Sequence, residues 1–186
     1  MSKSFSGDKI AILVANGFTE QDLTHTQRAL QAKGANTRII GMDQGVVNSW
    51  TGEAWGHHFA ADCALNTALA ADFDMLIIPG GRRSVEKLKL TAHTRRFLGG
   101  FIDAGKPVAL FNDALELLIF SERAEGRVVA GPQDYSKAVK EAGATYCEDS
   151  CVVDGNLITG YDADVNQYID AVIKHLADKP DMKEAA

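Results

Sequence analysis

Short apolar runs alternate along the chain with longer segments in which apolar residues recur every three or four positions. The short runs are typical of buried strands, and the longer segments are typical of helices with one buried side. We predict strands at Lys9–Ala15, Thr37–Gly41, Phe73–Pro79, Val108–Phe111 and Arg127–Ala130. Alternating strands and helices indicate parallel strands joined by right-handed crossovers.

The first helix has both of its expected end signals. Thr19 is a suitable N-cap, and Gly34 stops the helix after Lys33. Further helices are predicted in the segment that ends at Gly105, at Ala114–Phe120, at Tyr135–Ala142 and at Val165–Leu176; hairpins are predicted within Met42–Leu65 and at Cys151–Thr159.

These elements predict a single α/β domain, doubly wound and flavodoxin-like, with a mainly parallel sheet and helices on both faces. A chain of 186 residues can build one sizeable core and is short for two domains. We expect an N-terminal extension at 1–8, the α/β domain at 9–177 and a flexible tail at 178–186.

Composition narrows the class of partner. The net charge is −6, and the basic residues form no cluster beyond Arg82-Arg83 and Arg95-Arg96. This balance argues against nucleic acid or an anionic membrane as the main partner. The first residues lack the apolar core of a signal peptide, and no run approaches the length of a membrane span. Three cysteines make no disulfide framework, so a cytoplasmic location is the simplest expectation.

The segment from Lys106 to Phe120 carries the main candidate for a site. Only Asn112-Asp113 separates the buried strand Val108–Phe111 from the buried helix Ala114–Phe120. Such a tight turn pushes its tip residue into solvent above the sheet, where α/β enzymes place a nucleophile. The residue at the tip is Asn112, and an amide is a very poor nucleophile.

Two other segments reach the same edge of the predicted sheet. Ligands of doubly wound domains bind at the carboxyl ends of the strands. Asn16 to Asp22 and Gly80-Gly81 follow predicted strands there, as Asn112-Asp113 does. The candidate ligand-binding residues are therefore Asp22, Gly80, Gly81, Asn112 and Asp113.

Four motifs in this order resemble the ThiJ/PfpI superfamily, which has the class I glutamine-amidotransferase-like fold. They are Ala-Ile-Leu-Val-Ala-Asn-Gly-Phe-Thr-Glu-Gln-Asp, Phe-Asp-Met-Leu-Ile-Ile-Pro-Gly-Gly, Gly-Lys-Pro-Val-Ala-Leu-Phe-Asn-Asp and Val-Val-Asp-Gly-Asn-Leu-Ile-Thr-Gly. The resemblance covers roughly Lys9 to Leu176. It implies a cytoplasmic, often dimeric protein related to amidases, proteases, glyoxalases, deglycases and hydratases.

The family's elbow usually carries Cys, frequently followed by His-Gly, whereas this chain has Asn112, Asp113 and Ala114. The acid that family members aim at the Cys falls on Asp22, one methylene shorter than the usual Glu. The resemblance therefore implies a degenerate nucleophile elbow, without the family's Cys-dependent activities. In this respect the chain is similar to the extra C-terminal domain of large catalases, which resembles the same family and lacks its catalytic groups.

Each candidate also has a purely structural interpretation. Asp22, three positions after Thr19, can complete a capping box, and Glu20 is a favourable acid for a first helical turn. Gly80 and Gly81 can be turn glycines or, as the resemblance implies, oxyanion donors. Asp113 can be an exposed loop acid or a pocket group.

The histidines and cysteines predict little chemistry. His57 and His58 are adjacent on a predicted strand and point to opposite faces, which disfavours a shared metal. Cys147 and Cys151, if extended, stand about 13 Å apart, too far for a disulfide. Cys63 follows Asp62, whose charge disfavours a thiolate. We expect no metal and no cofactor.

Three functions remain open. The first is non-covalent binding of a small metabolite or carbonyl compound by a homodimer. The second is a non-nucleophilic hydrolase or lyase, with Asp22, Glu20 or Asp113 as acid or base. The third is an interaction module similar to the catalase appendage. For all three we predict that Asn112 has a positive φ, which Asn tolerates better than most residues, and that its side chain lines a pocket with Gly81 and Asp22.

Overall fold

Seven strands build a central sheet whose order along the sheet is β11-β12-β8-β7-β1-β3-β6. The structure, a computed structural model, describes residues 4–161 and 165–178, so most of the predicted tail lies outside the described residues. Neighbouring strands of the sheet are parallel except for the antiparallel pair β11 and β12. The strands are β1 (Lys9–Leu13), β3 (Asn36–Gly41), β6 (Cys63–Ala64), β7 (Met75–Ile78), β8 (Val108–Phe111), β11 (Cys151–Asp154) and β12 (Leu157–Gly160).

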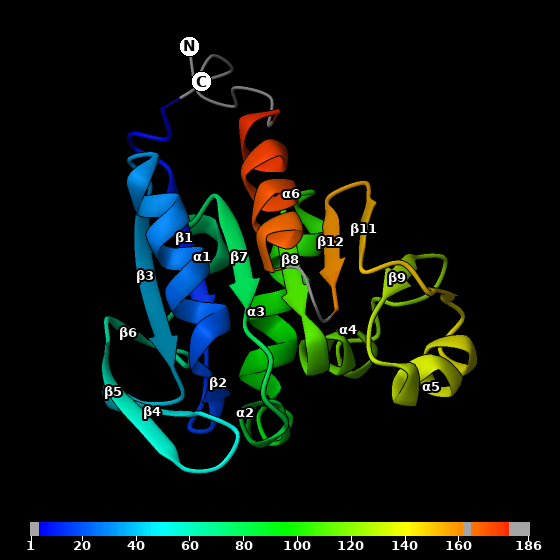
Figure 1. Ribbon diagram of the computed structural model, residues 1–186, viewed down its shortest axis with the longest axis horizontal. Coiled ribbons are helices and arrows are strands. Elements are labelled where there is room, and N and C mark those ends of the chain that lie inside the picture. Colours follow the sequence, from blue (N-terminus) through cyan, green and yellow to red (C-terminus); the bar gives the residue numbers. More distant parts are fainter. Residues whose placement is uncertain (1–3, 162–164, 179–186) are drawn as a thin grey trace.

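Helices cover both faces of this sheet (Figure 1). The helices of the described chain are α1 (Glu20–Ala32), α2 (Arg82–Leu88), α3 (Ala92–Asp103), α4 (Leu115–Phe120), α5 (Ser136–Glu141) and α6 (Val165–Ala177), with single 3-10 turns η1 (Ala70–Asp72), η2 (Asn112–Ala114) and η3 (Gln133–Tyr135). Of these, α5 lies to one side of the central sheet, beside β9 (Val128–Ala130; Figure 1). The domain is thus the predicted single, flavodoxin-like α/β domain with a mainly parallel sheet.

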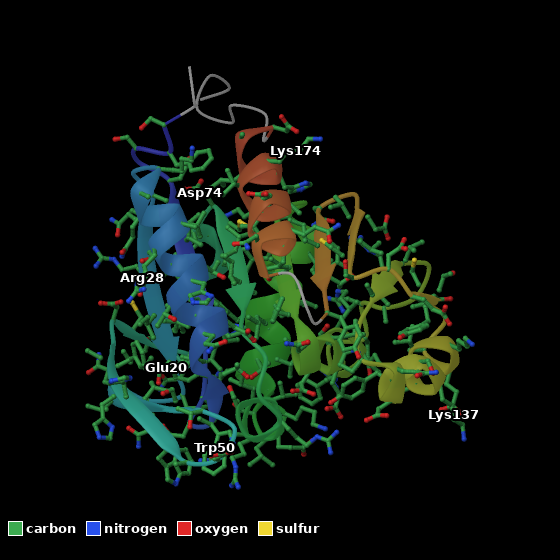
Figure 2. The ribbon with its side chains drawn as sticks, in the orientation of Figure 1. Glu20, Arg28, Trp50, Asp74, Lys137 and Lys174 are labelled. Carbon is green, nitrogen blue, oxygen red and sulfur yellow. The ribbon has the colours of Figure 1, made fainter. Side chains whose placement is uncertain are left out.

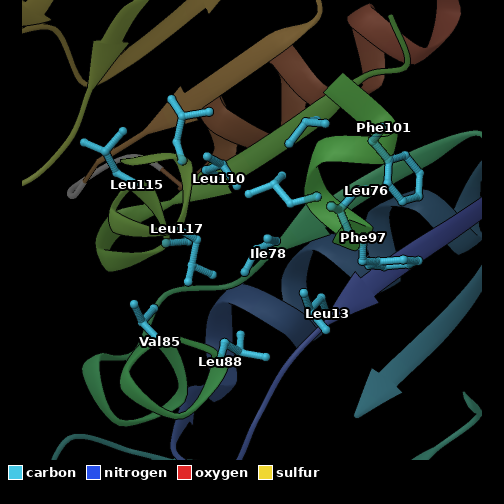
Figure 3. Packing of buried hydrophobic residues seen from close by; sticks show 14 of the residues in the cluster. Leu13, Leu76, Ile78, Val85, Leu88, Phe97, Phe101, Leu110, Leu115 and Leu117 are labelled. Carbon is cyan, nitrogen blue, oxygen red and sulfur yellow. The ribbon is translucent and has the colours of Figure 1, made fainter. Parts of the chain in front are cut away.

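The central strands divide their side chains between two hydrophobic clusters, because successive residues of a strand point to opposite faces. Leu13, Leu76 and Leu110 face a cluster shared with α2, α3 and α4 (Figure 3). Ile12 and Ile77 face the second cluster, which α1 and α6 complete. Each helix layer therefore holds one face of the sheet out of water, and the carboxyl edge is left for a site.

A second, three-stranded sheet projects beside the carboxyl edge and is coloured blue to cyan in Figure 1. It consists of β2 (Phe18–Thr19), β4 (Gly45–Trp50) and β5 (Trp55–Ala61). The antiparallel pair β4 and β5 confirms the hairpin predicted within Met42–Leu65. Two further strands, β9 (Val128–Ala130) and β10 (Thr145–Cys147), form a separate parallel pair.

The predicted central strands and the last helix are confirmed within a residue or two, and two expectations need correction. The segment after Gly81 holds two helices, α2 and α3, and not the one predicted. They separate at Thr91, whose side chain accepts the His93 N–H and caps α3. The strand predicted at Arg127–Ala130 exists as β9, but it pairs with β10 outside the central sheet.

Within residues 4–161 and 165–178, no helix is both long and apolar enough to cross a membrane.

Candidate functional site

The turn between β8 and α4 has the geometry predicted for an elbow. Asn112 follows the buried Phe111, and its own backbone φ is 51°, in the left-handed region. Among the described residues, Glu122 is the other non-glycine residue with positive φ. Asn tolerates this conformation because its short polar side chain can bond nearby groups. The prediction that Asn112 is a φ outlier is therefore confirmed.

Asp22 lies against this turn, as predicted. It belongs to the first turn of α1 and is 6% exposed. Its Oδ2 accepts the Gly80 N–H at 2.9 Å, and the Asn112 side chain is a second hydrogen-bond partner. The capping-box interpretation is wrong, because the Thr19 side chain caps nothing and the Thr19 N–H donates to the Gly80 carbonyl.

Burial dominates the acidity of Asp22. Removal from water raises its pKa from 3.8 to about 7, since a low-dielectric site disfavours the charged form. The hydrogen bonds from Gly80 and Asn112 oppose this rise, and the nearby Asp113 adds to it. The carboxyl group can therefore hold or release a proton near neutral pH.

The Gly80-Gly81 turn brings both of its amides against acids of this chain. The Gly81 N–H donates to Asp113 Oδ2 at 3.3 Å, as the Gly80 N–H donates to Asp22. A Cβ at Gly81 would lie 2.6 Å from the Gly17 carbonyl oxygen, so the turn admits no side chain. The two amides predicted as oxyanion donors thus contact carboxylates in this structure.

Asp113 is a bonded group and not a loop acid. Its Oδ1 accepts the Tyr135 hydroxyl at 3.1 Å. Burial, followed by the charge of Asp113, raises the pKa of Tyr135 well above its usual range. The exposed Arg82 is a further hydrogen-bond partner of the Tyr135 hydroxyl. Asp113, Tyr135 and Arg82 form one polar chain beside the elbow.

Tyr168, from α6, contacts the residue that precedes the elbow. Its ring packs on Phe111 at 4.6 Å between centroids, and a Cβ at Gly160 would come within 2.3 Å of it. The side chain is 2% exposed, and its hydroxyl has no hydrogen-bond partner within the part of the chain that the structure describes. Burial, followed by the charge of Asp22, raises the pKa of Tyr168 well above its usual range.

Glu20 points away from the elbow and toward the hairpin. Its carboxylate accepts the Ser49 hydroxyl and, at 3.1 Å, the His57 N–H, and it lies 2.6 Å from His57 Nδ1. These contacts, led by the Ser49 hydrogen bond, lower the pKa of Glu20 to about 2. Figure 2 labels Glu20 and Trp50, which line a cavity of about 200 Å³ with Thr19, Gln21 and Thr51.

The remaining candidates keep structural roles. His57 bonds Glu20, and His58 Nδ1 bonds the Asn48 side chain. The three cysteines are free and half-buried. Within residues 4–161 and 165–178, no group of three His, Cys, Asp or Glu side chains can hold a metal ion. The pocket predicted over Asn112 stays a prediction.

A parallel sheet with a left-handed Asn at the turn after β8, beside an acid and a Gly-Gly turn, defines an α/β domain with an elbow site. The chain belongs to the DJ-1/PfpI family, whose profile matches residues 8–175. This confirms the predicted ThiJ/PfpI relationship. The replacement of a family cysteine by Asn112 and the likeness to catalase domains stay predictions.

Two curated relatives match most of the chain. A Bacillus subtilis (strain 168) protein named "Putative cysteine protease YraA" is 30% identical over 151 residues, covering 81% of this chain and 87% of that protein. An uncharacterized protein of Staphylococcus saprophyticus is 32% identical over 153 residues, with the same coverage of 81% and 87%.

Solved structures agree with the fold. A two-domain protein of Anabaena variabilis, with DJ-1/ThiJ/PfpI-like and ferritin-like domains, superposes with a TM-score of 0.85 at 27% identity. That match covers 96% of this chain and 52% of the two-domain chain, so this chain spans about half of its length. A cysteine-to-alanine mutant of a DJ-1 superfamily protein from Salmonella typhimurium has a TM-score of 0.81 at 26% identity, covering 91% and 90% of the two chains.

The sequence predicted one site for Asp22, Gly80, Gly81, Asn112 and Asp113, and the structure brings these residues together. Tyr135 and Tyr168 lie within predicted helices, and the sequence pattern did not assign either of them to the site. A tyrosine at an otherwise apolar helix position was the available signal, because a buried hydroxyl needs a partner.

Proposed function

We propose that this DJ-1/PfpI family member binds a small metabolite or carbonyl compound at the Asn112 elbow without covalent catalysis. The observation that carries this proposal is the left-handed Asn112, which is bonded to the buried Asp22. The family resemblance implies that related enzymes usually hold a cysteine at this position. An amide keeps the bend and removes the thiolate. It also offers both a donor and an acceptor to a bound molecule.

The contacts of the glycine turn support this proposal. Catalysis through an oxyanion needs amide donors that face the developing charge. The Gly80 and Gly81 N–H groups instead contact Asp22 and Asp113. Both N–H groups are therefore already bonded, and the charge of Asp113 disfavours an oxyanion at the same place, whereas a neutral ligand bonded to Asn112 meets no such repulsion.

The test is a titration with hydroxyacetone, a small neutral carbonyl compound, followed by NMR of the backbone amides. We expect saturable shifts at Gly81 and Asn112, unchanged hydroxyacetone after incubation, and an unchanged protein mass after denaturation. Asn112→Gly should fold and lose affinity. No shift at the elbow, or a covalent adduct, would contradict the proposal.

The cysteines provide a control for this experiment. Cys63, Cys147 and Cys151 lie outside the elbow segment. We expect iodoacetamide treatment to leave the binding of hydroxyacetone unchanged in the folded protein. A loss of binding after alkylation, with the fold intact, would assign the site to one of these thiols.

A second candidate function is acid–base catalysis without a nucleophile, and the pKa of Asp22 favours it. A group with a pKa of about 7 can accept and return protons at neutral pH. Asp22 and Asp113 are the candidates, because Glu20 is bonded to the hairpin. Exchange of the α-protons of hydroxyacetone for deuterium, abolished in Asp22→Asn, would identify this function. Binding without exchange would reject it.

The assembly proposed for this protein is a homodimer in the cytoplasm, which rests on the family resemblance. A mass measurement in solution tests the dimer. A monomer at micromolar concentration would remove that part of the proposal.

A further inference from the structure

The Tyr168 hydroxyl is a buried polar group without a hydrogen-bond partner among the residues that the structure describes. The side chain is 2% exposed, and its oxygen meets no donor or acceptor within residues 4–161 and 165–178. Buried hydroxyls are nearly always paired, because an unpaired one costs the free energy of removing it from water. An orphan hydroxyl beside a candidate site therefore indicates a group that the ligand satisfies.

The backbone directs this hydroxyl toward the carboxyl edge of the sheet. Tyr168 lies in the first turn of α6, which begins at Val165. Side chains of a helix tilt toward its N-terminus, and α6 begins beside the carboxyl edge of the sheet, shortly after β12 ends (Figure 1). Gly160, the last residue of β12, pairs with Phe111, the residue before Asn112.

The ring is fixed in this orientation by its neighbours. Phe111 packs against one side of it at 4.6 Å, and Gly160 leaves room that a side chain would fill. Asp22 is close enough for its charge to act on the tyrosine. Tyr168, Asp22 and Asn112 therefore come to the elbow from α6, α1 and the turn after β8.

We propose that the Tyr168 hydroxyl is a specificity-determining donor of the elbow site, and that the ligand is an uncharged carbonyl or hydroxycarbonyl compound and not a carboxylate. This inference rests on the proposed binding function of the same site. The hydroxyl donates to the ligand's oxygen, which supplies the partner that the described part of the chain does not.

The acids of the site disfavour an anionic ligand. Asp22 and Asp113 both lie at the elbow, where Asp22 accepts the Gly80 N–H and Asp113 accepts the Gly81 N–H. A carboxylate ligand would be repelled by the charge of Asp113, and by that of Asp22 whenever Asp22 is ionised. A neutral carbonyl oxygen accepts the same hydrogen bond without that repulsion.

The test compares Tyr168→Phe with Tyr146→Phe as the matched control. Both substitutions remove one phenolic hydroxyl, but the Tyr146 hydroxyl is satisfied by the Gly131 carbonyl at 2.9 Å. The probes are hydroxyacetone and glycolate, which differ by a methyl group in place of a charged oxygen. Affinities come from the NMR shifts of the Gly81 and Asn112 amides.

We expect Tyr168→Phe to weaken hydroxyacetone binding by about fivefold to tenfold, as one lost hydrogen bond predicts. Tyr146→Phe should leave the affinity unchanged, and glycolate should bind more weakly than hydroxyacetone. Without ligand, Tyr168→Phe should unfold at the wild-type temperature or above it, because it removes an unsatisfied group.

Each contrary result has its own meaning. Equal binding by wild type and Tyr168→Phe overturns the donor role while the proposed function stands. Tighter binding of glycolate overturns the neutral-ligand claim. A loss of stability in ligand-free Tyr168→Phe identifies a fixed water as the partner of the hydroxyl and also overturns the inference. If hydroxyacetone shifts no elbow amide in the wild type, the proposed function and this inference both fail.

Discussion

Asp22 and Glu20 lie two residues apart in the first turn of α1, and the structure drives their acidities in opposite directions. The pKa of Asp22 rises to about 7, whereas the pKa of Glu20 falls to about 2. Asp22 is buried against the elbow, with Gly80 and Asn112 as partners. Glu20 faces the hairpin, where Ser49 and His57 stabilise its charge.

The difference follows from what replaces water around each group. Asp22 loses water and receives too few hydrogen bonds to make up for that loss. Glu20 receives a hydroxyl, an amide and an imidazole while it stays close to solvent. One helical turn thus holds a structural anion that fastens the hairpin and a carboxyl group that can exchange its proton.

The largest effect is expected from Asp22→Asn. A raised carboxyl pKa means that the folded protein binds this proton more tightly, so the free energy of unfolding falls as pH rises from 3.8 to about 7. The substitution removes this pH dependence, which lowers the free energy of unfolding of the wild type by about 4 kcal/mol at most between these two pH values. Urea unfolding at pH 4 and pH 8 measures it. If the free energy of unfolding of Asp22→Asn changed with pH as it does in the wild type, the pH dependence would not arise from protonation of Asp22.

Gly81→Ala tests the turn that holds the amides against the acids. Its Cβ would meet the backbone of Gly17, Phe18 and Thr19 within 2.9 Å. Gly52→Ala is the control, because Gly52 also has a positive φ but has open space around its Cβ. We expect Gly81→Ala to lose about 3 kcal/mol more stability than the control, by overpacking. Equal losses in thermal unfolding would show that only φ matters.

The fold was predictable because its signals are local, and parts of the site were not because they depend on contacts across the chain. Val108–Phe111 and the short turn after it predicted an elbow, and the tolerance of Asn for positive φ predicted the conformation of Asn112. The pattern around Thr19 also allowed Asp22 to complete a capping box. That alternative was wrong because local spacing carries no information about the Gly80 N–H, 58 residues away, which donates to Asp22.

The missed elements have the same explanation. In α2 the buried residues include Ser84, whose hydroxyl accepts the Ala15 N–H, so the helix has a weak apolar repeat. The short strand β10 pairs with β9 outside the main sheet. Tyr168 matched the apolar spacing of the last helix, and spacing does not reveal where a hydroxyl points.

Asn112→Val tests the conformation at the centre of the elbow. A β-branched residue fits φ 51 poorly, so we expect a loss of about 2 kcal/mol in the free energy of unfolding. Asn112→Gly should be nearly neutral, because glycine adopts positive φ without strain. Equal stability of the two variants in chemical unfolding would refute the strained turn.

The smallest effect is expected from Glu20→Gln. A lowered carboxyl pKa contributes stability that is present above 4.5 and is lost as pH falls toward 2. Solvent screening limits the effect to about 1 kcal/mol. Unfolding should therefore show Glu20→Gln less stable than wild type at pH 7 and equal to it near pH 2. The exposed Glu53→Gln is the control, and a matching change there would remove the role of Glu20 in holding the hairpin.

The most direct test is an NMR titration of the side-chain carboxyl carbons of Asp22 and Glu20 in the folded wild-type protein. The account predicts that Asp22 titrates at about 7 and Glu20 at about 2. An Asp22 pKa near 3.8 would contradict it, because the elbow would then hold an ordinary hydrated carboxylate and not a buried, proton-exchanging one.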